Sequence, residues 1–498
     1  MKRNLIAFVV ALLGELLLIY APSTLAVPSY SRRYGMECSG CHTMWGSLNG
    51  AGVTFRLSGY RAIFGRDLTP VSEDIEIAKG VTIPSTLPLS FITGVGVDSR
   101  SEKREAGGAS VTSKGTSLAL EDASIFMTSP LGSHLSTFVE FPMYETRAWE
   151  FTPTGNFEAH NTTAPRQIKF STESPAFEVA KFFWNNPIGG LPRDSFNLLG
   201  GITHMPLAYP PGKVRLSVNQ YLIYERTALE LISPRRVSDV LGADENDVAF
   251  RFSEPQVIAE IFGMTTFGAP VTDAAKRETM WGEYHLGITN GSNAKAANNS
   301  QKAMYARGIL RYYNQSLGIF AFRNGDSYND AIRTTGSIAG NPNGIMSGSQ
   351  TENKVTRWGP DFTLSLLPAG VPVWLENQFM FNKETNPTGF GQEFKWNGGF
   401  HQLNWQPSKT TIVYARYDRL KGDAFNDTTV TMNGVTGITL STPKEHDVVL
   451  GWQHLYEQNV KLVAEFRQHT FEDTATGAGQ SAAKLTDQGF TLRVMFGF

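Results

Sequence analysis

Cysteine is almost absent from this sequence, because its 498 residues contain only two. A disulfide scaffold is therefore excluded, since such a framework needs several cysteine pairs. An excess of charge of one sign is also missing, as 44 Lys and Arg stand against 46 Asp and Glu without any basic block. A nucleic-acid binder carries a basic patch or stripe, so we expect no nucleic-acid partner.

Long hydrophobic runs are missing after residue 26. A transmembrane helix needs about 20 apolar residues, so none is predicted there. Before that point, Lys2 and Arg3 precede an apolar stretch from Leu5 to Tyr20, and small residues follow at 24–26. This order predicts a signal peptide over residues 1–26, with an N-terminal membrane anchor as the alternative. Export without a transmembrane helix leaves the periplasm, secretion or an outer-membrane barrel.

The two cysteines lie in one motif, Cys38-Ser39-Gly40-Cys41-His42. The spacing C-x-x-C-H is that of c-type haem attachment, in which both thiols form thioethers and the histidine is the proximal iron ligand. A redox-active dithiol and half of a zinc site are the alternatives. A structural zinc needs four ligands, and the sequence has no second cysteine pair. A dithiol would not require His42. One covalent haem c is therefore predicted.

The haem-binding segment is short, from residue 27 to 68. A segment of this size cannot enclose a haem in a core of its own, so we expect the rest of the chain to supply walls. Arg56, Arg61 and Arg66 follow the motif closely. They could pair with the haem propionates, or they could be ordinary solvated side chains.

Strands with period two dominate the remainder of the chain. Near the C-terminus, Phe490, Leu492 and Val494 alternate with Thr491 and Arg493, and similar runs cover 459–470, Val214–Tyr224 and Trp374–Phe381. Many such runs of about ten residues predict an all-β antiparallel outer-membrane barrel. Nine hairpins are expected, at 89–128, 133–172, 177–204, 213–266, 280–313, 317–367, 371–406, 409–456 and 459–498. This gives 18 strands, or 16 because the third and fourth hairpins are irregular.

The connections between these strands alternate in length. Short turns at 314–316, 368–370, 407–408 and 457–458 alternate with long Gly/Ser/Asn/Thr-rich loops at 325–358, 383–393, 420–445 and 471–486. Outer-membrane barrels have short periplasmic turns and long extracellular loops. Aromatic residues expected to form an interfacial girdle stand beside the short turns: Tyr312, Tyr313, Trp405 and Tyr456. We predict a linker at 69–88 and a porin-like barrel at 89–498, with the haem segment in the lumen or at the periplasmic mouth.

The distal haem ligand is the open question of the site. His134 follows a short turn and is expected on the lumenal face with Ser136 and Glu140, while Met380 shares that face with Glu376. Either His134 or Met380 is a candidate, and each is also explained as an ordinary lumenal residue. Glu140 and Glu376 could guide ferrous iron or be the usual charges of a polar lumen.

The whole arrangement resembles the fused outer-membrane cytochrome-porins of iron-oxidising bacteria. The likeness rests on the signal, the single haem motif, the run Leu48-Asn49-x-x-Gly52-x-x-Phe55-Arg56-x-x-Gly59-Tyr60 and a long barrel ending in Phe498. It implies transfer of single electrons from extracellular Fe(II) to a periplasmic cytochrome or copper protein, an Fe(II):cytochrome c oxidoreductase type of reaction. Only Cys38, Cys41 and His42 carry over as functional residues.

Two other functions stay open. One is a diffusion porin whose lumen holds a haem plug, and the other is a conduit for a different extracellular donor or acceptor. Other catalytic motifs are missing from the sequence, including the phosphate loop, the zinc helix H-E-x-x-H and the nucleophile elbow G-x-S-x-G.

Overall fold

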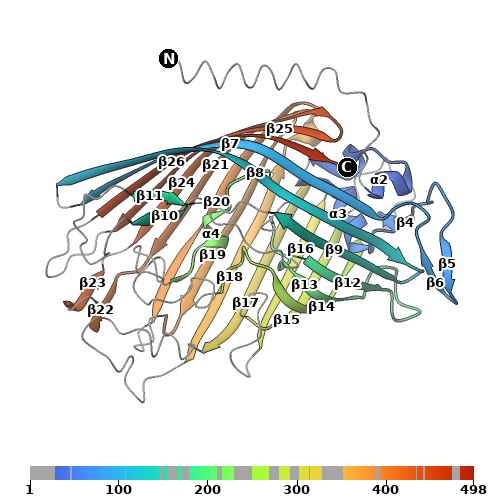
Figure 1. Ribbon diagram of the computed structural model, residues 1–498. Coiled ribbons are helices and arrows are strands. Elements are labelled where there is room, and N and C mark those ends of the chain that lie inside the picture. The colour runs from blue at the N-terminus through green and yellow to red at the C-terminus, as the bar shows by residue number, and fades with distance from the viewer. Residues whose placement is uncertain are drawn as a thin grey trace.

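Sixteen strands of the computed structural model close into one antiparallel barrel (Figure 1). This confirms the predicted all-β class and the lower of the two expected strand counts. The structure describes residues 29–44, 47–106, 108–144, 150–153, 166–169, 179–209, 216–228, 231, 250–267, 280–291, 302–312, 314–327, 352–387, 393–432, 435–440, 443–473 and 483–498. The predicted signal peptide lies outside these residues.

The barrel strands follow the chain in order, and β26 pairs with β7 to close the wall. They are β7 (Leu89–Ala106), β8 (Ala109–Leu131), β9 (Leu135–Tyr144), β12 (Val179–Asn185), β13 (Asn197–Thr203), β14 (Gln256–Phe267), β15 (Met280–Thr289), β16 (Ala303–Tyr312), β17 (Gln315–Ser327), β18 (Glu352–Ser365), β19 (Val373–Glu384), β20 (Phe394–Ser408), β21 (Thr411–Gly422), β24 (Lys444–Glu457), β25 (Val460–Asp473) and β26 (Ala483–Gly497). A 3₁₀ helix, η2 (Leu367–Ala369), lies in the connection between β18 and β19.

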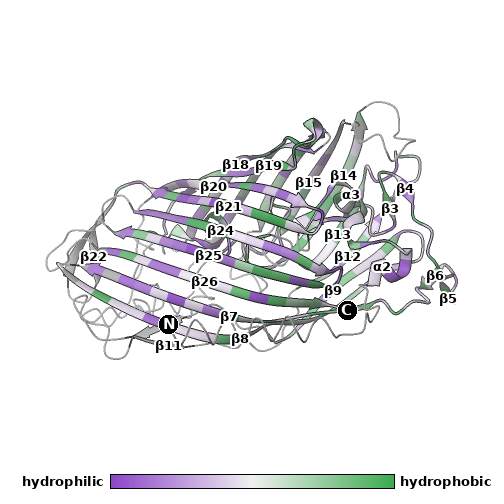
Figure 2. Ribbon diagram, turned by 90° about the horizontal axis from the view of Figure 1, so that it is seen from above, coloured by the Kyte–Doolittle hydropathy of each residue, from purple (hydrophilic) through white to green (hydrophobic). Residues whose placement is uncertain are grey.

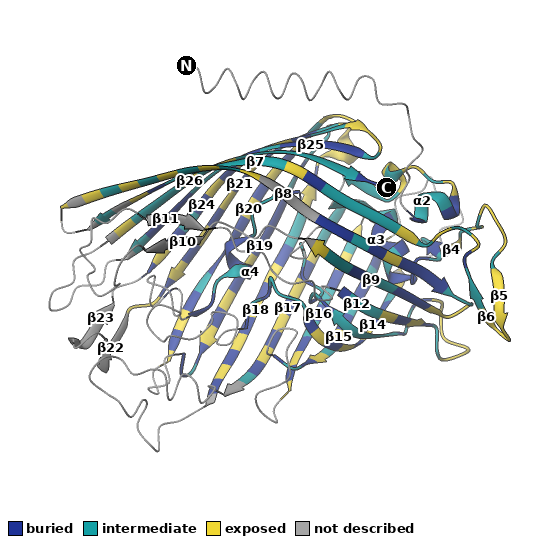
Figure 3. Cartoon of the chain, viewed as in Figure 1, coloured by how far each residue is buried: buried dark blue, intermediate teal, exposed yellow. Residues whose placement is uncertain are grey.

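The two faces of the wall differ in polarity, as strand periodicity requires. On β24, Glu445 and Asp447 are buried on the lumenal side, whereas Leu450 and Trp452 are 52% and 37% exposed on the outside. Figure 3 shows this alternation of buried and exposed residues on many strands. Hydrophilic residues of β7 and β26 gather toward the end of the barrel that lies away from the C-terminus (Figure 2). A polar lumen inside an apolar outer face is typical of barrels in lipid.

One end of the barrel has the short turns that the sequence predicts. At this end, three residues or fewer separate β8 from β9, β16 from β17, β20 from β21 and β24 from β25. At the other end, 24 residues separate the end of β17 from the start of β18, and nine separate β25 from β26. The exposed side chains of Tyr312, Trp405 and Tyr456 lie beside the short turns, and Tyr313 lies outside the described residues. Both ends of the wall meet at this side, where the Phe91 amide donates to the Phe498 carbonyl at 2.9 Å.

Two predicted hairpins are wrong. In 133–172 only β9 belongs to the wall, because β10 (Glu150–Pro153) and β11 (Arg166–Lys169) pair only with each other and β9 pairs with β12. In 213–266 only β14 is a wall strand. A second hairpin outside the wall, β22 (Phe425–Met432) with β23 (Val435–Leu440), lies in the chain between β21 and β24, which pair with each other.

The chain between β13 and β14 folds back into the lumen. We call its described residues 204–209, 216–228, 231 and 250–255 the inward segment. It contains a one-turn helix, α4 (Leu222–Glu225), and its Tyr221 ring stacks on the lumenal Phe400 ring with centroids 4.0 Å apart. The alternating apolar residues predicted as a strand therefore bury themselves against lumenal aromatic side chains, not against lipid.

The N-terminal part, which we call the plug (residues 29–68), lies at the short-turn end beside the C-terminus (Figure 1). Its elements are α2 (Ser29–Tyr34), η1 (Cys38–Gly40), β1 (His42–Met44), β2 (Ser47–Leu48), α3 (Gly50–Leu57), β3 (Ala62–Ile63) and β4 (Arg66–Asp67). A hairpin of β5 (Ile75–Ala78) and β6 (Val81–Ile83) connects the plug to β7. Among the described residues, no helix is long and apolar enough to cross a membrane.

Candidate functional site

The Cys38-to-His42 motif, predicted to attach haem, forms a tight turn. The Cys41 amide donates to the Cys38 carbonyl at 3.2 Å, and the Gly40 amide donates to the Glu37 carbonyl at 3.0 Å. His42 then begins the short strand β1, which pairs with β2. The turn places the two cysteines and the histidine on one compact unit.

Asn49 fixes this turn to the helix that follows. Its amide group donates to the carbonyls of Ser39 at 3.2 Å and Gly40 at 3.3 Å, and its Oδ1 accepts the Gly52 amide at 3.0 Å as the N-cap of α3. Gly52 lets the helix approach the turn, since a Cβ at this position would lie 2.1 Å from the Cys41 carbonyl oxygen. Both residues belong to the Leu48-to-Tyr60 run, whose pattern alone predicts no role for them.

The plug is attached to the short turns of the wall. Gln406 donates to the Thr43 carbonyl at 3.1 Å, and the Cys38 thiol lies 3.7 Å from the Gln458 carbonyl oxygen. On the opposite side of the plug, Asn185 donates to the Leu57 carbonyl at 3.0 Å. The haem motif therefore lies at the short-turn mouth.

The plug shares its apolar core with the barrel. Tyr60 stacks on Phe138 of β9 and meets Phe183 of β12 edge to face, with centroids 5.9 and 5.5 Å apart. Phe262 and Trp281 of the wall belong to the same buried cluster. The segment therefore has no separate core of its own among the described residues and packs against the barrel wall.

A cavity of about 560 Å³ lies between the plug and the wall. Cys38, Cys41 and His42 line it together with side chains from much of the barrel wall. Sites for cofactor-sized molecules measure roughly 300–1,000 Å³. The structure therefore brings all three predicted haem-binding residues to one cavity large enough for a cofactor.

The chemistry of these three side chains fits a haem better than the alternatives. Both thiols are free, and burial, with help from Cys38, raises the pKa of Cys41 to about 11. A redox-active dithiol needs the opposite, a thiol of lowered pKa. Burial also lowers the pKa of His42 to about 4, so the imidazole is neutral and able to ligate a metal. Its buried Nδ1 has no hydrogen-bond partner among the described residues.

The predicted distal ligands lie elsewhere. His134 is in the turn before β9, not on the strand face, and its Nδ1 lies 3.1 Å from the Asn185 carbonyl oxygen. Met380 does face the lumen, where it is fully buried in the cluster around the inward segment. Neither residue lines the cavity that contains His42. Besides His42, the histidines and methionines that do line it are Met36, His204, Met205, His285 and Met495.

Some of the residues predicted to pair with the haem propionates or to guide iron line the cavity, and others do not. Arg56 lines the cavity, whereas Arg61 donates to the Gly132 carbonyl at 3.1 Å and Arg66 is exposed on β4. Glu140 and Glu376 both line the cavity as lumenal residues. Within the described residues, no three His, Cys, Asp or Glu side chains come together as a metal site. The two glutamates therefore do not form a ready-made site for ferrous iron.

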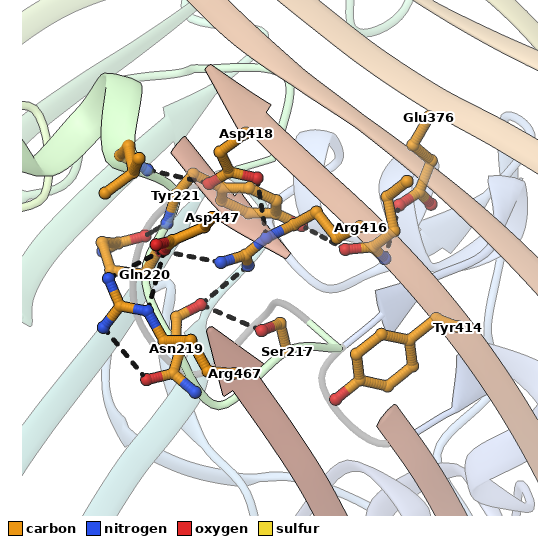
Figure 4. Close-up of polar contacts among 12 residues, drawn as sticks. Ser217, Asn219, Gln220, Tyr221, Glu376, Tyr414, Arg416, Asp418, Asp447 and Arg467 are labelled. Carbon is orange, nitrogen blue, oxygen red and sulfur yellow. Dashed lines mark hydrogen bonds and ion pairs between the residues drawn. The ribbon is translucent and has the colours of Figure 1, made fainter. Parts of the chain in front are cut away.

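The inward segment is held in the lumen by carboxylates of the wall (Figure 4). Asp418 accepts the Leu222 amide at 3.0 Å, and Glu465 accepts the amides of Val218 and Asn219, each at 3.0 Å. Arg416 donates to the Asn219 carbonyl at 2.8 Å. This network satisfies backbone groups of a segment that has no neighbouring strand.

Comparisons with known proteins give little beyond the fold. No protein-family model and no curated protein matches the chain. Solved structures do match: the outer membrane channel DcaP of Acinetobacter baumannii at 9% identity and a TM-score of 0.46, covering 86% of this chain and all of that one. An anion-selective porin from Comamonas acidovorans matches at 11% identity and 0.41, over 82% of this chain and all of that one. Salmonella typhi OmpF in complex with daunomycin matches at 10% and 0.39, over 86% and 100%.

Proposed function

We propose that this chain is an outer-membrane cytochrome-porin, in which a 16-stranded barrel carries one covalent haem c at its lumenal plug. The observation that carries the proposal is the shared cavity of Cys38, Cys41 and His42 inside the barrel. Cys38 and Cys41 would form the thioethers, and His42 would be the proximal ligand. When bound, the haem supplies exchange of single electrons at its iron.

Location in the outer membrane is supported by the wall itself. Its outer face presents apolar side chains, its lumenal face is polar, and exposed aromatic residues stand beside the short turns. Short turns face the periplasm in barrels of this kind. The plug, which lies at that end, would then be within reach of a periplasmic cytochrome or copper protein.

The direction of transfer follows from the resemblance to cytochrome-porins of iron-oxidising bacteria. Extracellular Fe(II) would lose one electron and become Fe(III), and the periplasmic acceptor would gain that electron. The chain's own contribution is to hold the motif through Asn49 and Gly52, to keep His42 neutral by burial, and to limit water in the lumen by means of the plug and the inward segment.

A diffusion porin is the second candidate, and the barrel favours it. A closed antiparallel wall of 16 strands with a polar lumen is wide enough for an aqueous channel. In that function the plug would occlude or gate the channel.

Two measurements on purified protein separate these functions. Stopped-flow spectroscopy after mixing the oxidised protein with Fe(II) should show reduction of the haem bands, and His42→Ala should abolish it. His454→Ala is the matched control, because this histidine stacks on Trp452 on the outer face of β24. Large single-channel conductance without haem reduction would establish the diffusion porin instead.

A further inference from the structure

Two cations face the cavity without an anionic partner. Arg56 projects from the plug helix α3 and Lys181 from the wall strand β12, and both line the cavity beside the haem motif. Among the described residues, neither has a carboxylate within ion-pair distance. Two other cavity arginines differ, because Arg307 pairs with Asp361 at 3.0 Å and Arg311 pairs with Glu283 at 3.1 Å.

Aromatic rings and a like charge lie beside these two cations, and the carboxylates that attract them lie beyond ion-pair distance. The Lys181 ammonium lies 5.3 and 5.4 Å from the ring centroids of Phe138 and Phe183, and its hydrogen bond to Thr203 Oγ1 is long at 3.4 Å. Burial lowers the pKa of Arg56, although more distant Glu283 opposes the change. The positive charges of Arg56 and Lys181 also repel each other. Both side chains are half-buried. Desolvation of a cation without a counter-ion is costly, so the pair is suited to an anionic ligand.

Two carboxylates of the wall, Glu260 and Glu140, attract Lys181 without an ion pair to it. Glu260 attracts Lys181 only from beyond ion-pair distance. One of its oxygens lies 2.9 Å from His285 Nδ1, and the other accepts the Tyr305 hydroxyl at 2.5 Å. Glu260 is therefore held by side chains of β15 and β16. It forms no ion pair with Arg56 or Lys181, which can both bind a ligand in the cavity.

We propose that Arg56 and Lys181 bind the two propionate carboxylates of the haem attached at Cys38 and Cys41. This inference rests on the proposed haem. Two cations match two carboxylates, and in a haem the thioether-forming vinyl groups and the propionates lie at opposite edges of the ring. A haem anchored at the motif therefore directs its carboxylates away from the thiols and into the cavity. One cation comes from the plug and one from the wall, so the haem joins the two.

Reduction midpoint potentials of the complete protein test this assignment. Arg56→Leu and Lys181→Met each leave a carboxylate without its cation, and the extra negative charge stabilises the ferric state. We expect each change to reduce the equilibrium constant for reduction about tenfold, which equals about 59 mV for a one-electron couple. Arg56→Lys should retain most of the wild-type potential. Arg66→Leu, at an exposed position of β4, is the control and should leave it unchanged.

Mass spectrometry separates failure of this inference from failure of the proposed function. If wild-type protein carries no haem mass on its two thiols, the proposed function is wrong. If haem is attached and both variants keep the wild-type potential, the propionates bind elsewhere. Infrared difference spectra of oxidised and reduced wild type need no variant. Propionates paired with cations give carboxylate bands, and a protonated carboxylic-acid band at neutral pH would overturn the assignment.

Discussion

The plug and the inward segment both lie in the lumen, but the barrel holds them by different means. Apolar contacts such as Tyr60 on Phe138 attach the plug, along with hydrogen bonds from the wall to its backbone carbonyls. The inward segment is held by buried carboxylates of the wall that accept its backbone amides. Charged side chains at the inward segment form ion pairs, such as Arg416 with Asp418 and Arg226 with Glu445. Arg56 of the plug and Lys181 of the wall beside it form none with a described residue.

This contrast assigns the two regions different tasks. Buried hydrogen-bond networks rigidify a structure, so we expect the inward segment to act as a fixed partition in the lumen. The cavity lies between the plug, the wall and residues 204–209 of the inward segment, and Arg56 and Lys181 face it without a carboxylate in ion-pair distance. Both are properties of a binding site. Any ligand of this lumen is therefore expected at the plug, on the short-turn side of the partition.

The largest expected effect comes from removing an anchor of the partition. Glu465→Ala removes the carboxylate that accepts the part-buried amides of Val218 and Asn219, and with it the acceptor of the Tyr414 hydroxyl. Each such loss costs about 1–3 kcal/mol, so docking of the segment should weaken by about 3 kcal/mol or more. Hydrogen exchange of these two amides should accelerate about a hundredfold or more.

Glu472→Ala is the matched control for this experiment. Glu472 lies on the same strand, where it is more exposed and pairs with Lys484 at 3.5 Å. Exchange at Val218 and Asn219 should stay at the wild-type rate in this variant. Equal acceleration in both variants would mean that the whole wall had loosened, and the partition would then have no anchor of its own.

A smaller effect is expected at the haem motif. Gly52→Ala forces a Cβ against the Cys41 carbonyl oxygen, which is backbone and cannot move without distorting the turn. Overpacking of this kind costs about 1–3 kcal/mol. The fraction of protein carrying covalent haem, measured by mass spectrometry, should fall while the barrel still assembles. Gly40→Ala is the control, since a Cβ there meets no atom within 4 Å; unchanged haem content in Gly52→Ala would remove this role of Gly52.

The sequence was sufficient to predict those features of the fold that depend on a local pattern of residues. Period-two alternation located most wall strands, and turn composition located the short-turn end. Alternation failed at 216–224, because it reports which side chains are apolar and not whether the backbone has a neighbouring strand. There the amides bond to Asp418 and Glu465, residues far away in the sequence. The sequence also could not predict that Arg56 and Lys181 line the same cavity, because the two residues lie far apart in the chain.

The smallest effect is expected at the outer edge of the plug. Asp67 accepts from Arg193 at 2.8 Å, and this hydrogen bond lowers the pKa of Asp67. A carboxyl with a lowered folded pKa contributes stability above its unfolded value of about 3.9 and loses it as the pH falls through the folded value. The Asp67 side chain is 72% exposed, so the pair contributes only about 0.2–1 kcal/mol. Asp67→Asn should therefore weaken plug docking slightly at pH 7, as measured by hydrogen exchange of α3, and should match wild type once the pH is below the folded pKa. A difference that persists in acid, or that survives 1 M salt undiminished, would show that Asp67 acts through packing and not through its charge.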